Sequence, residues 1–316
     1  MDDQFGTHAT AARGRISGVL TTVEAMTTTT PLAVVGEACA RSGLNASGAV
    51  PLHQHAATLY LIEAECVIVR LNYDIDDRRR ARTVVELTRW LTQQDFPSVA
   101  PANVEQPLDI HDYTVTFWRY YPQNNRPKPT VGHLGAILRH LHSLPVPLIE
   151  LHPYQPLKNL SDSVRASVVL SVGDRAWLLA RRTELLDEYA RLDFPLGHGW
   201  IHGDAYPGNM LWDGDWALLG DWDEVGTGPR ELDLVNTHQG ARFGRPRAEC
   251  DAFTTAYGYD ITEWPGFPIL REMRDLHTLG SYIRLADTGN ERAATEFDFR
   301  LDTLKRGHVD VQWNAR

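Results

Sequence analysis

The segment from residue 199 to residue 221 constrains the fold more than any other part of the chain. It begins with a short apolar strand, and a Pro-Gly pair in the following loop excludes a regular helix there. An Asp-Gly-Asp turn at 213–215 then separates two apolar runs, so we expect a tight hairpin of two strands. Because this hairpin folds the chain back on itself, it can place Asp221 beside Asn209.

This arrangement can bring three oxygen-bearing side chains together. Asp204 lies in the loop, Asn209 follows five positions later, and Asp221 comes after the hairpin. Phosphoryl transfer needs such a set, because a carboxylate must accept the proton of the attacking hydroxyl and hard oxygen ligands must hold Mg²⁺ at the nucleotide phosphates. Protein kinases have the same Asp-to-Asn spacing and a metal-binding Asp downstream. The sequence therefore predicts a phosphotransferase that uses Mg²⁺ with ATP or GTP.

The stretch from His202 to Leu234 resembles the aminoglycoside phosphotransferase and choline-kinase-like superfamily. It contains the H-G-D-x-x-x-x-N signature of that superfamily, followed by Asp-Trp, Gly-Pro and Asp-Leu in the same order. The resemblance covers roughly residues 31–310. It implies an α+β, bilobal protein-kinase-like fold, with an antiparallel sheet in a small N-lobe and a larger, mainly helical C-lobe.

The resemblance also implies a role for each residue of the motif. Asp204 matches the catalytic base, and His202 matches the histidine that braces the catalytic loop. Asn209 and Asp221 match ligands of Mg²⁺. Asp233 matches a structural aspartate that follows the metal-binding loop.

The N-terminal half supplies candidates for nucleotide binding. Arg70 lies in the β-type run Cys66 to Leu71, where protein kinases place a phosphate-holding Lys, and arginine can bind phosphate through two nitrogens. Glu86 in the next helix could orient Arg70, or it could pair with arginines of its own helix. Thr58 follows a glycine-poor loop and offers a hydroxyl to a phosphate. By resemblance to the kinase hinge, Trp118 and Tyr120 should border the adenine.

A Pro/Asn-rich link suggests where the chain divides. We assign residues 27–121 to the nucleotide-binding lobe, residues 122–316 to the catalytic and acceptor-binding lobe, and residues 1–26 to a disordered tail. The hydrophobic fraction of 43% is ample for a folded core. No apolar run reaches the length of about 20 residues that a membrane span needs. The three cysteines form no C-x-x-C pair, which indicates a reducing, cytoplasmic compartment.

The acceptor site is expected among the C-terminal helices, where Glu272 and Asp275 are candidate carboxylates. The formal net charge of −10 argues against nucleic acid as a partner and favours a cationic acceptor. One interpretation is therefore a resistance enzyme that phosphorylates an aminoglycoside or a basic cyclic peptide of the tuberactinomycin type. The alternatives are a metabolic kinase for an amino alcohol, sugar or similar acceptor, and a nucleotide-binding pseudoenzyme. The presence of both Asp204 and Asp221 disfavours the pseudoenzyme.

Overall fold

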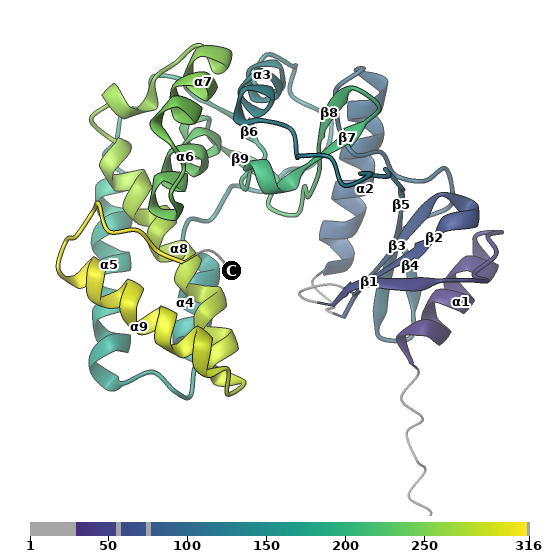
Figure 1. Ribbon diagram of the computed structural model, residues 1–316, viewed down its shortest axis with the longest axis horizontal. Helices are drawn as coiled ribbons and strands as arrows, with labels where there is room; N and C mark the ends of the chain where they lie inside the picture. Colours follow the sequence, from purple (N-terminus) through teal and green to yellow (C-terminus); the bar gives the residue numbers. More distant parts are fainter. Residues whose placement is uncertain (1–29, 55–57, 74–76, 315–316) are drawn as a thin grey trace, which may run out of the picture.

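The protein folds into a smaller lobe with a sheet and a larger helical lobe, as the computed structural model shows (Figure 1). The structure describes residues 30–54, 58–73 and 77–314, so the tail predicted at 1–26 lies outside the described residues. Within these ranges the smaller lobe has an antiparallel sheet in the order β1-β2-β3-β5-β4. Its strands are β1 (Val50–Gln54), β2 (Thr58–Ile62), β3 (Val67–Asn72), β4 (Leu108–Ile110) and β5 (Tyr113–Arg119). This arrangement confirms the predicted bilobal α+β fold.

A small apolar core covers one face of this sheet. Successive side chains of a strand point to opposite faces, and in β3 every second residue from Val67 onward is buried. These residues pack against the apolar side of α1 (Pro31–Arg41), which contributes Val34 and Val35. The opposite face of β3 carries Arg70 toward the larger lobe, where it lines a cavity.

The larger lobe is built around one long helix. In α8, buried residues recur every three or four positions, and α4, α6 and α9 pack against it. Helix starts follow local capping chemistry, as in α5, where the Ser171 side chain accepts a hydrogen bond from the Asp174 amide at 3.0 Å. No helix of the described ranges is long and apolar enough to cross a membrane. The helices are α3 (Val131–Leu141), α4 (Lys158–Ala166), α5 (Val172–Tyr189), α6 (Glu231–Gln239), α7 (Arg247–Tyr257), α8 (Phe267–Asp287) and α9 (Glu291–Lys305).

Two short antiparallel pairs of strands support the loops between the lobes. The strand β6 (His198–Ile201) pairs with β9 (Gly226–Pro229). The strands β7 (Met210–Asp213) and β8 (Trp216–Leu219) form the predicted hairpin, with Met210 opposite Leu219. The turn between them depends on Gly214, whose φ of 57° lies in the left-handed region that favours glycine.

One helix connects the two lobes through its packing. The helix α2 (Asp77–Gln93) follows β3 in the chain, yet its buried residues Val84, Leu87 and Leu91 belong to the core of the larger lobe. The Trp90 ring lies edge-on to a tryptophan of β6, with 5.6 Å between the ring centroids. Because α2 also packs against β5 of the sheet, it contacts both lobes.

Candidate active site

The loop after β6 and the hairpin meet as the motif spacing predicts. The Asn209 side-chain nitrogen donates a hydrogen bond to the main-chain oxygen of Asp204 at 3.0 Å. The Gly220 amide donates to the Asn209 main-chain oxygen at 2.9 Å, which brings the next residue, Asp221, beside the asparagine. Asp221 has a φ of 61°, a left-handed conformation that is uncommon for a residue other than glycine. Backbone strain of this kind is typical of functional positions.

His202 ties the two loops together from within the core. Its side chain is fully buried, and Nδ1 accepts a hydrogen bond from the Asp204 amide at 3.3 Å. Because Nδ1 accepts, the ring proton belongs on Nε2, which donates to the Gly220 carbonyl at 3.0 Å. His202 therefore holds the loop of Asp204 against the loop of Asp221, in line with a bracing role.

Asp233 anchors the same loop from α6. Its fully buried carboxylate accepts hydrogen bonds from the amides of His202, at 2.8 Å, and Gly203, at 2.7 Å. A third contact joins it to Nε2 of His142 at 3.0 Å. Burial alone would raise the pKa of Asp233, but the hydrogen bond and charge of His142 hold it below its ordinary value. The carboxylate is thus kept ionised as a fixed acceptor.

We expect Asp233→Ala to lower the free energy of unfolding by about 3–5 kcal/mol, because it leaves buried donors without their charged acceptor. Urea denaturation followed by fluorescence measures this change. The exposed Asp298 of α9 provides a control, and Asp298→Ala should alter stability by less than about 0.5 kcal/mol. Equal unfolding midpoints for both variants would contradict the anchoring role of Asp233.

The side chains around Asp221 suit a divalent cation. Burial raises the pKa of Asp221, and the nearby carboxylate of Asp223 raises it further. The groups around Asp221 therefore do not fully stabilise its negative charge, and a bound cation would do so. Since the Asn209 amide nitrogen is used by Asp204, its amide oxygen is the atom available to a cation. Carboxylate and amide oxygens fit Mg²⁺. Among the described side chains no group of three His, Cys, Asp or Glu could hold a metal.

An apolar cavity of about 530 Å³ opens next to Asn209 and Asp221. Trp118 and Tyr120 line it, at the place where the sequence predicts the adenine. The Trp118 indole nitrogen donates to the Thr116 hydroxyl at 2.9 Å, which fixes the ring. An apolar slot that ends in polar groups suits a nucleotide base and its phosphates. Further apolar walls come from the sheet, α2, the hairpin and two loops, namely Leu52, Leu59, Ile68, Val84, Val99, Leu211 and Trp222.

The predicted contact of Thr58 with a phosphate stays a prediction. Thr58 begins β2, where it pairs with Gln54 on one side and Leu71 on the other. The loop at 55–57, which would have to approach the phosphates together with Thr58, lies outside the described residues.

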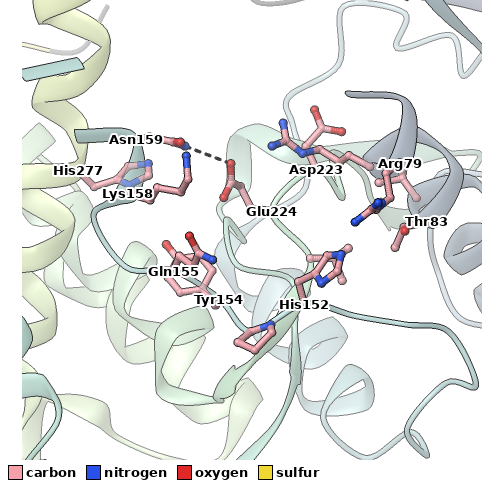
Figure 2. Close-up of a pocket in the computed structure, with 14 residues that line it drawn as sticks. Arg79, Thr83, His152, Tyr154, Gln155, Lys158, Asn159, Asp223, Glu224 and His277 are labelled. Atoms are coloured by element: carbon pink, nitrogen blue, oxygen red, sulfur yellow. Dashed lines mark hydrogen bonds between the residues drawn. The ribbon is translucent and has the colours of Figure 1, made fainter. Parts of the chain in front are cut away.

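Arg70 is oriented by a different carboxylate from the one that the sequence predicts. Its Nη1 donates to Asp223 at 3.1 Å, and Nη2 forms a second short bond to the same carboxylate. Glu86 instead lies exposed on α2, beside Arg89 in a groove away from the cleft. The side of α2 that lines a smaller cavity carries Arg79, Arg80 and Thr83, and Figure 2 shows Thr83 on this side of the cavity, apart from Glu224. The prediction that Glu86 orients Arg70 is therefore wrong, and the carboxylate of Asp223 binds Arg70 instead.

The two candidate acceptor carboxylates are occupied elsewhere in the larger lobe. Glu272 receives two hydrogen bonds from Arg181 of α5, at 2.6 Å and 2.8 Å. Asp275 is 1% exposed and accepts from Gln239 and Arg242, each at 3.0 Å. A buried carboxylate of this kind needs its partners to compensate for lost hydration. The structure corrects both expectations, because these side chains hold helices together.

The space beside Asp204 in the larger lobe is a cavity of about 800 Å³, which we call the acceptor cavity. Arg274 of α8 lines it and donates to the Asp204 Oδ1 atom at 2.8 Å, and Asn236 lies 3.4 Å from the same oxygen. Sequence reasoning missed Arg274, because one arginine in an amphipathic helix belongs to no motif. The cavity is lined by Asn159, Asp204, Tyr206, Asn236, Gln239, Gly240, Phe243, Gly244, Arg245, Pro246, Glu249, Arg274, His277, Thr278, Gly280, Ser281, Tyr282, Arg284 and Arg300.

A smaller cavity of about 300 Å³ lies between α2 and the larger lobe. It shares Asn159 and His277 with the acceptor cavity, so the two spaces adjoin. Figure 2 shows these residues on the side opposite α2, with Asn159 donating a hydrogen bond to Glu224 at 3.4 Å.

Comparison with known proteins agrees with this geometry. A family model described as "Phosphotransferase enzyme family" matches residues 52–273. An amicoumacin kinase in complex with AMP-PNP and Ca²⁺ has a TM-score of 0.73 at 14% identity, covering 89% of this chain and 95% of that one. A microcompartment-associated aminopropanol kinase has a TM-score of 0.67 at 16% identity, with 88% and 98% covered.

A third similar structure is a choline/ethanolamine kinase family protein from Mesorhizobium loti. Its TM-score is 0.61 at 15% identity, and the match covers 86% of this chain and 94% of that one. At such identities the likeness shows the fold. No curated protein sequence matches the chain.

Proposed function

Since this chain belongs to the phosphotransferase enzyme family, in which it is a small-molecule kinase, we propose that Asp204, Asn209 and Asp221 carry out its reaction. That reaction transfers the γ-phosphoryl group of ATP to a hydroxyl group of a small acceptor. The observation that carries the proposal is that Asn209 joins the loop of Asp204 to the loop of Asp221 through two hydrogen bonds. The adjoining apolar cavity supports a nucleotide at this place.

The roles of the residues follow from their contacts. Arg274 and Asn236 lie at Oδ1 of Asp204, so the other carboxylate oxygen can receive the proton of the acceptor hydroxyl. Asn209 and Asp221 would hold Mg²⁺, which when bound neutralises charge on the nucleotide phosphates. Arg70, oriented by Asp223, would hold phosphate oxygens from the smaller lobe.

Two acceptor classes follow from the sequence and from similar structures. The names of the similar proteins include one kinase of an antibiotic, amicoumacin, and one kinase of an amino alcohol, aminopropanol. An antibiotic-inactivating role would confer resistance, whereas a metabolic kinase would act on an amino alcohol, a sugar or a similar acceptor. Both share every residue of the catalytic loop, so the acceptor cavity separates them.

A panel experiment tests the proposed function. The protein is incubated with Mg²⁺ and ATP, or GTP, together with basic antibiotics, amino alcohols, sugars and hydroxy acids. Mass spectrometry should find one added phosphoryl group on at least one compound. If no compound is modified and ATP hydrolysis is also absent, the assignment to this reaction fails.

We expect Arg70→Ala to raise the KM for ATP about 10- to 100-fold, because each hydrogen bond to a charged group contributes about 1.5–3 kcal/mol. Steady-state kinetics at saturating acceptor measure the change. Glu86→Ala is the matched control and should leave this KM unaltered, since Glu86 is exposed away from the cleft. If Glu86→Ala raised the KM for ATP strongly and Arg70→Ala did not, neither the role of Arg70 nor the correction of Glu86 would stand.

A further inference from the structure

One histidine lines both the acceptor cavity and the smaller cavity. His277 lies on α8 three positions after Arg274, which donates to Asp204 at 2.8 Å. Side chains three apart on a helix are neighbours, with about 5–6 Å between their Cβ atoms. The charge of Asp204 acts on the imidazole, so the ring lies near the place where the acceptor hydroxyl reacts. Asn159 of α4 is the other residue that both cavities share.

The imidazole of His277 has no partner within the protein. It makes no hydrogen bond or ion pair with any other residue of the described ranges. Both ring nitrogens keep accessible surface, so a molecule in the cavities can reach them. A polar group that leaves bulk water without a new partner loses hydrogen bonds, and a group of the acceptor would replace them here.

The charge state of His277 limits which group can bind. Burial lowers the pKa of His277 to about 4, with the charge of Arg274 as the next cause. The ring is therefore neutral near pH 7, and it offers one N–H donor and one nitrogen acceptor. A neutral ring supplies no counter-charge, so an ammonium or carboxylate group placed against it would lose hydration without compensation. An uncharged polar group suits this position best.

Asn159 supplies a complementary acceptor at the same place. Its Nδ2 atom donates to Glu224 at 3.4 Å, which leaves its Oδ1 atom for another donor. A hydroxyl group can donate to this oxygen and accept from the imidazole N–H through a single oxygen atom. A carbonyl group only accepts, and an ammonium group only donates. A hydroxyl group is therefore the one that uses both residues.

We propose that the acceptor carries at least two hydroxyl groups, as sugars and polyols do, and that His277 binds one of them while Asp204 deprotonates another. The proposal rests on the proposed function, because it assigns a substrate class to the same catalytic loop. It makes His277 a specificity-determining residue that takes part in binding and not in proton transfer. It also favours the sugar type among the acceptors that the sequence leaves open.

Polyols and acceptors with a single hydroxyl test the proposal. Ribose, glucose and myo-inositol are titrated by calorimetry into the protein saturated with Mg²⁺ and AMP-PNP, beside ethanolamine and aminopropanol. At least one polyol should bind about 10-fold or more tightly than both amino alcohols, because it makes the additional hydrogen bonds. Amino alcohols that bind as tightly as every polyol would overturn the proposal, and so would the absence of polyol binding.

Deoxy analogues separate recognition from folding. The polyol that binds most tightly is compared with its monodeoxy analogues, each of which has one hydroxyl replaced by hydrogen. Loss of the hydroxyl that His277 binds should weaken binding about 10- to 100-fold in the unmodified protein and less than about 3-fold in His277→Ala. A purely structural role of His277 would weaken the binding of polyol and analogue equally, and this result would contradict the proposal.

Two further variants complete the test. His277→Gln keeps an uncharged donor and acceptor, so it should retain part of the preference for the polyol over its deoxy analogue. The exposed His308 provides the matched control, because its contact with Arg242 uses the main-chain oxygen. His308→Ala should keep the full preference.

Failure of the proposed function gives a different result. If AMP-PNP does not bind with Mg²⁺, the phosphotransferase assignment fails, and the same titrations in protein without nucleotide still decide whether His277 binds a hydroxyl. If AMP-PNP binds but no polyol depends on His277, only the polyol proposal fails.

Discussion

Asp204→Asn should reduce kcat about 10²- to 10⁴-fold, the usual contribution of a general base. Asparagine has nearly the size of aspartate and keeps an oxygen for Arg274, but it cannot take up the hydroxyl proton. The main-chain contact with Asn209 does not involve the substituted carboxylate, so the loop should hold its shape. The measurement is steady-state turnover of an acceptor identified in the panel.

Two controls accompany the Asp204→Asn measurement. The KM for ATP and the thermal unfolding temperature should stay close to those of the unmodified protein, because neither depends on proton uptake. Full turnover in Asp204→Asn would remove Asp204 from the role of base. A fall in turnover matched by loss of folding would leave a structural explanation instead, and circular dichroism distinguishes the two.

Asp221→Ala should abolish the use of Mg²⁺ and ATP, with kcat/KM falling about 10³-fold or more. The reason is that Asp221 supplies the carboxylate of the proposed metal site, which Asn209 alone cannot replace. Binding of AMP-PNP should also lose its dependence on Mg²⁺ when measured by calorimetry. The charge removed is the one whose pKa burial raises, so the variant should fold at least as well as the unmodified protein.

The hairpin itself provides the matched control for Asp221→Ala. Asp215 lies in the turn of the same hairpin, and its side chain is fully exposed in the contact that it makes with Arg126. Asp215→Ala should therefore keep full activity. Magnesium-dependent turnover in Asp221→Ala would refute the metal assignment.

The catalytic loop could be predicted from the sequence because local chemistry determines its shape. A proline and glycines exclude a helix after β6, and the Asp-Gly turn directs the hairpin back to Asn209. These constraints act within about twenty residues of Asp204, so no distant contact had to be known. The bracing roles of His202 and Asp233 come from the family resemblance and stay predictions, and both side chains are buried.

Pairings between distant segments could not be predicted in this way. Arg70 and Asp223 are far apart in sequence, and they meet only because the sheet packs beside the loop after Asp221. In the sequence, Asp275 cannot be distinguished from an exposed helix aspartate. Only the packing of the helices shows that it is buried and bound to Arg242. Net charge is likewise a sum over the whole surface, so it does not tell which charged side chains line a particular cavity.

The packing of α2 has a consequence for regulation. Protein kinases are switched off when the corresponding helix swings outward and its glutamate leaves the phosphate-binding lysine. Here Val84, Leu87 and Leu91 are buried in the core of the larger lobe, and Arg70 takes its partner from the loop after Asp221. An outward swing would expose that core and still leave Arg70 paired. We therefore expect the hold of Arg70 on the phosphates to depend on the loop after Asp221 as well as on the position of this helix.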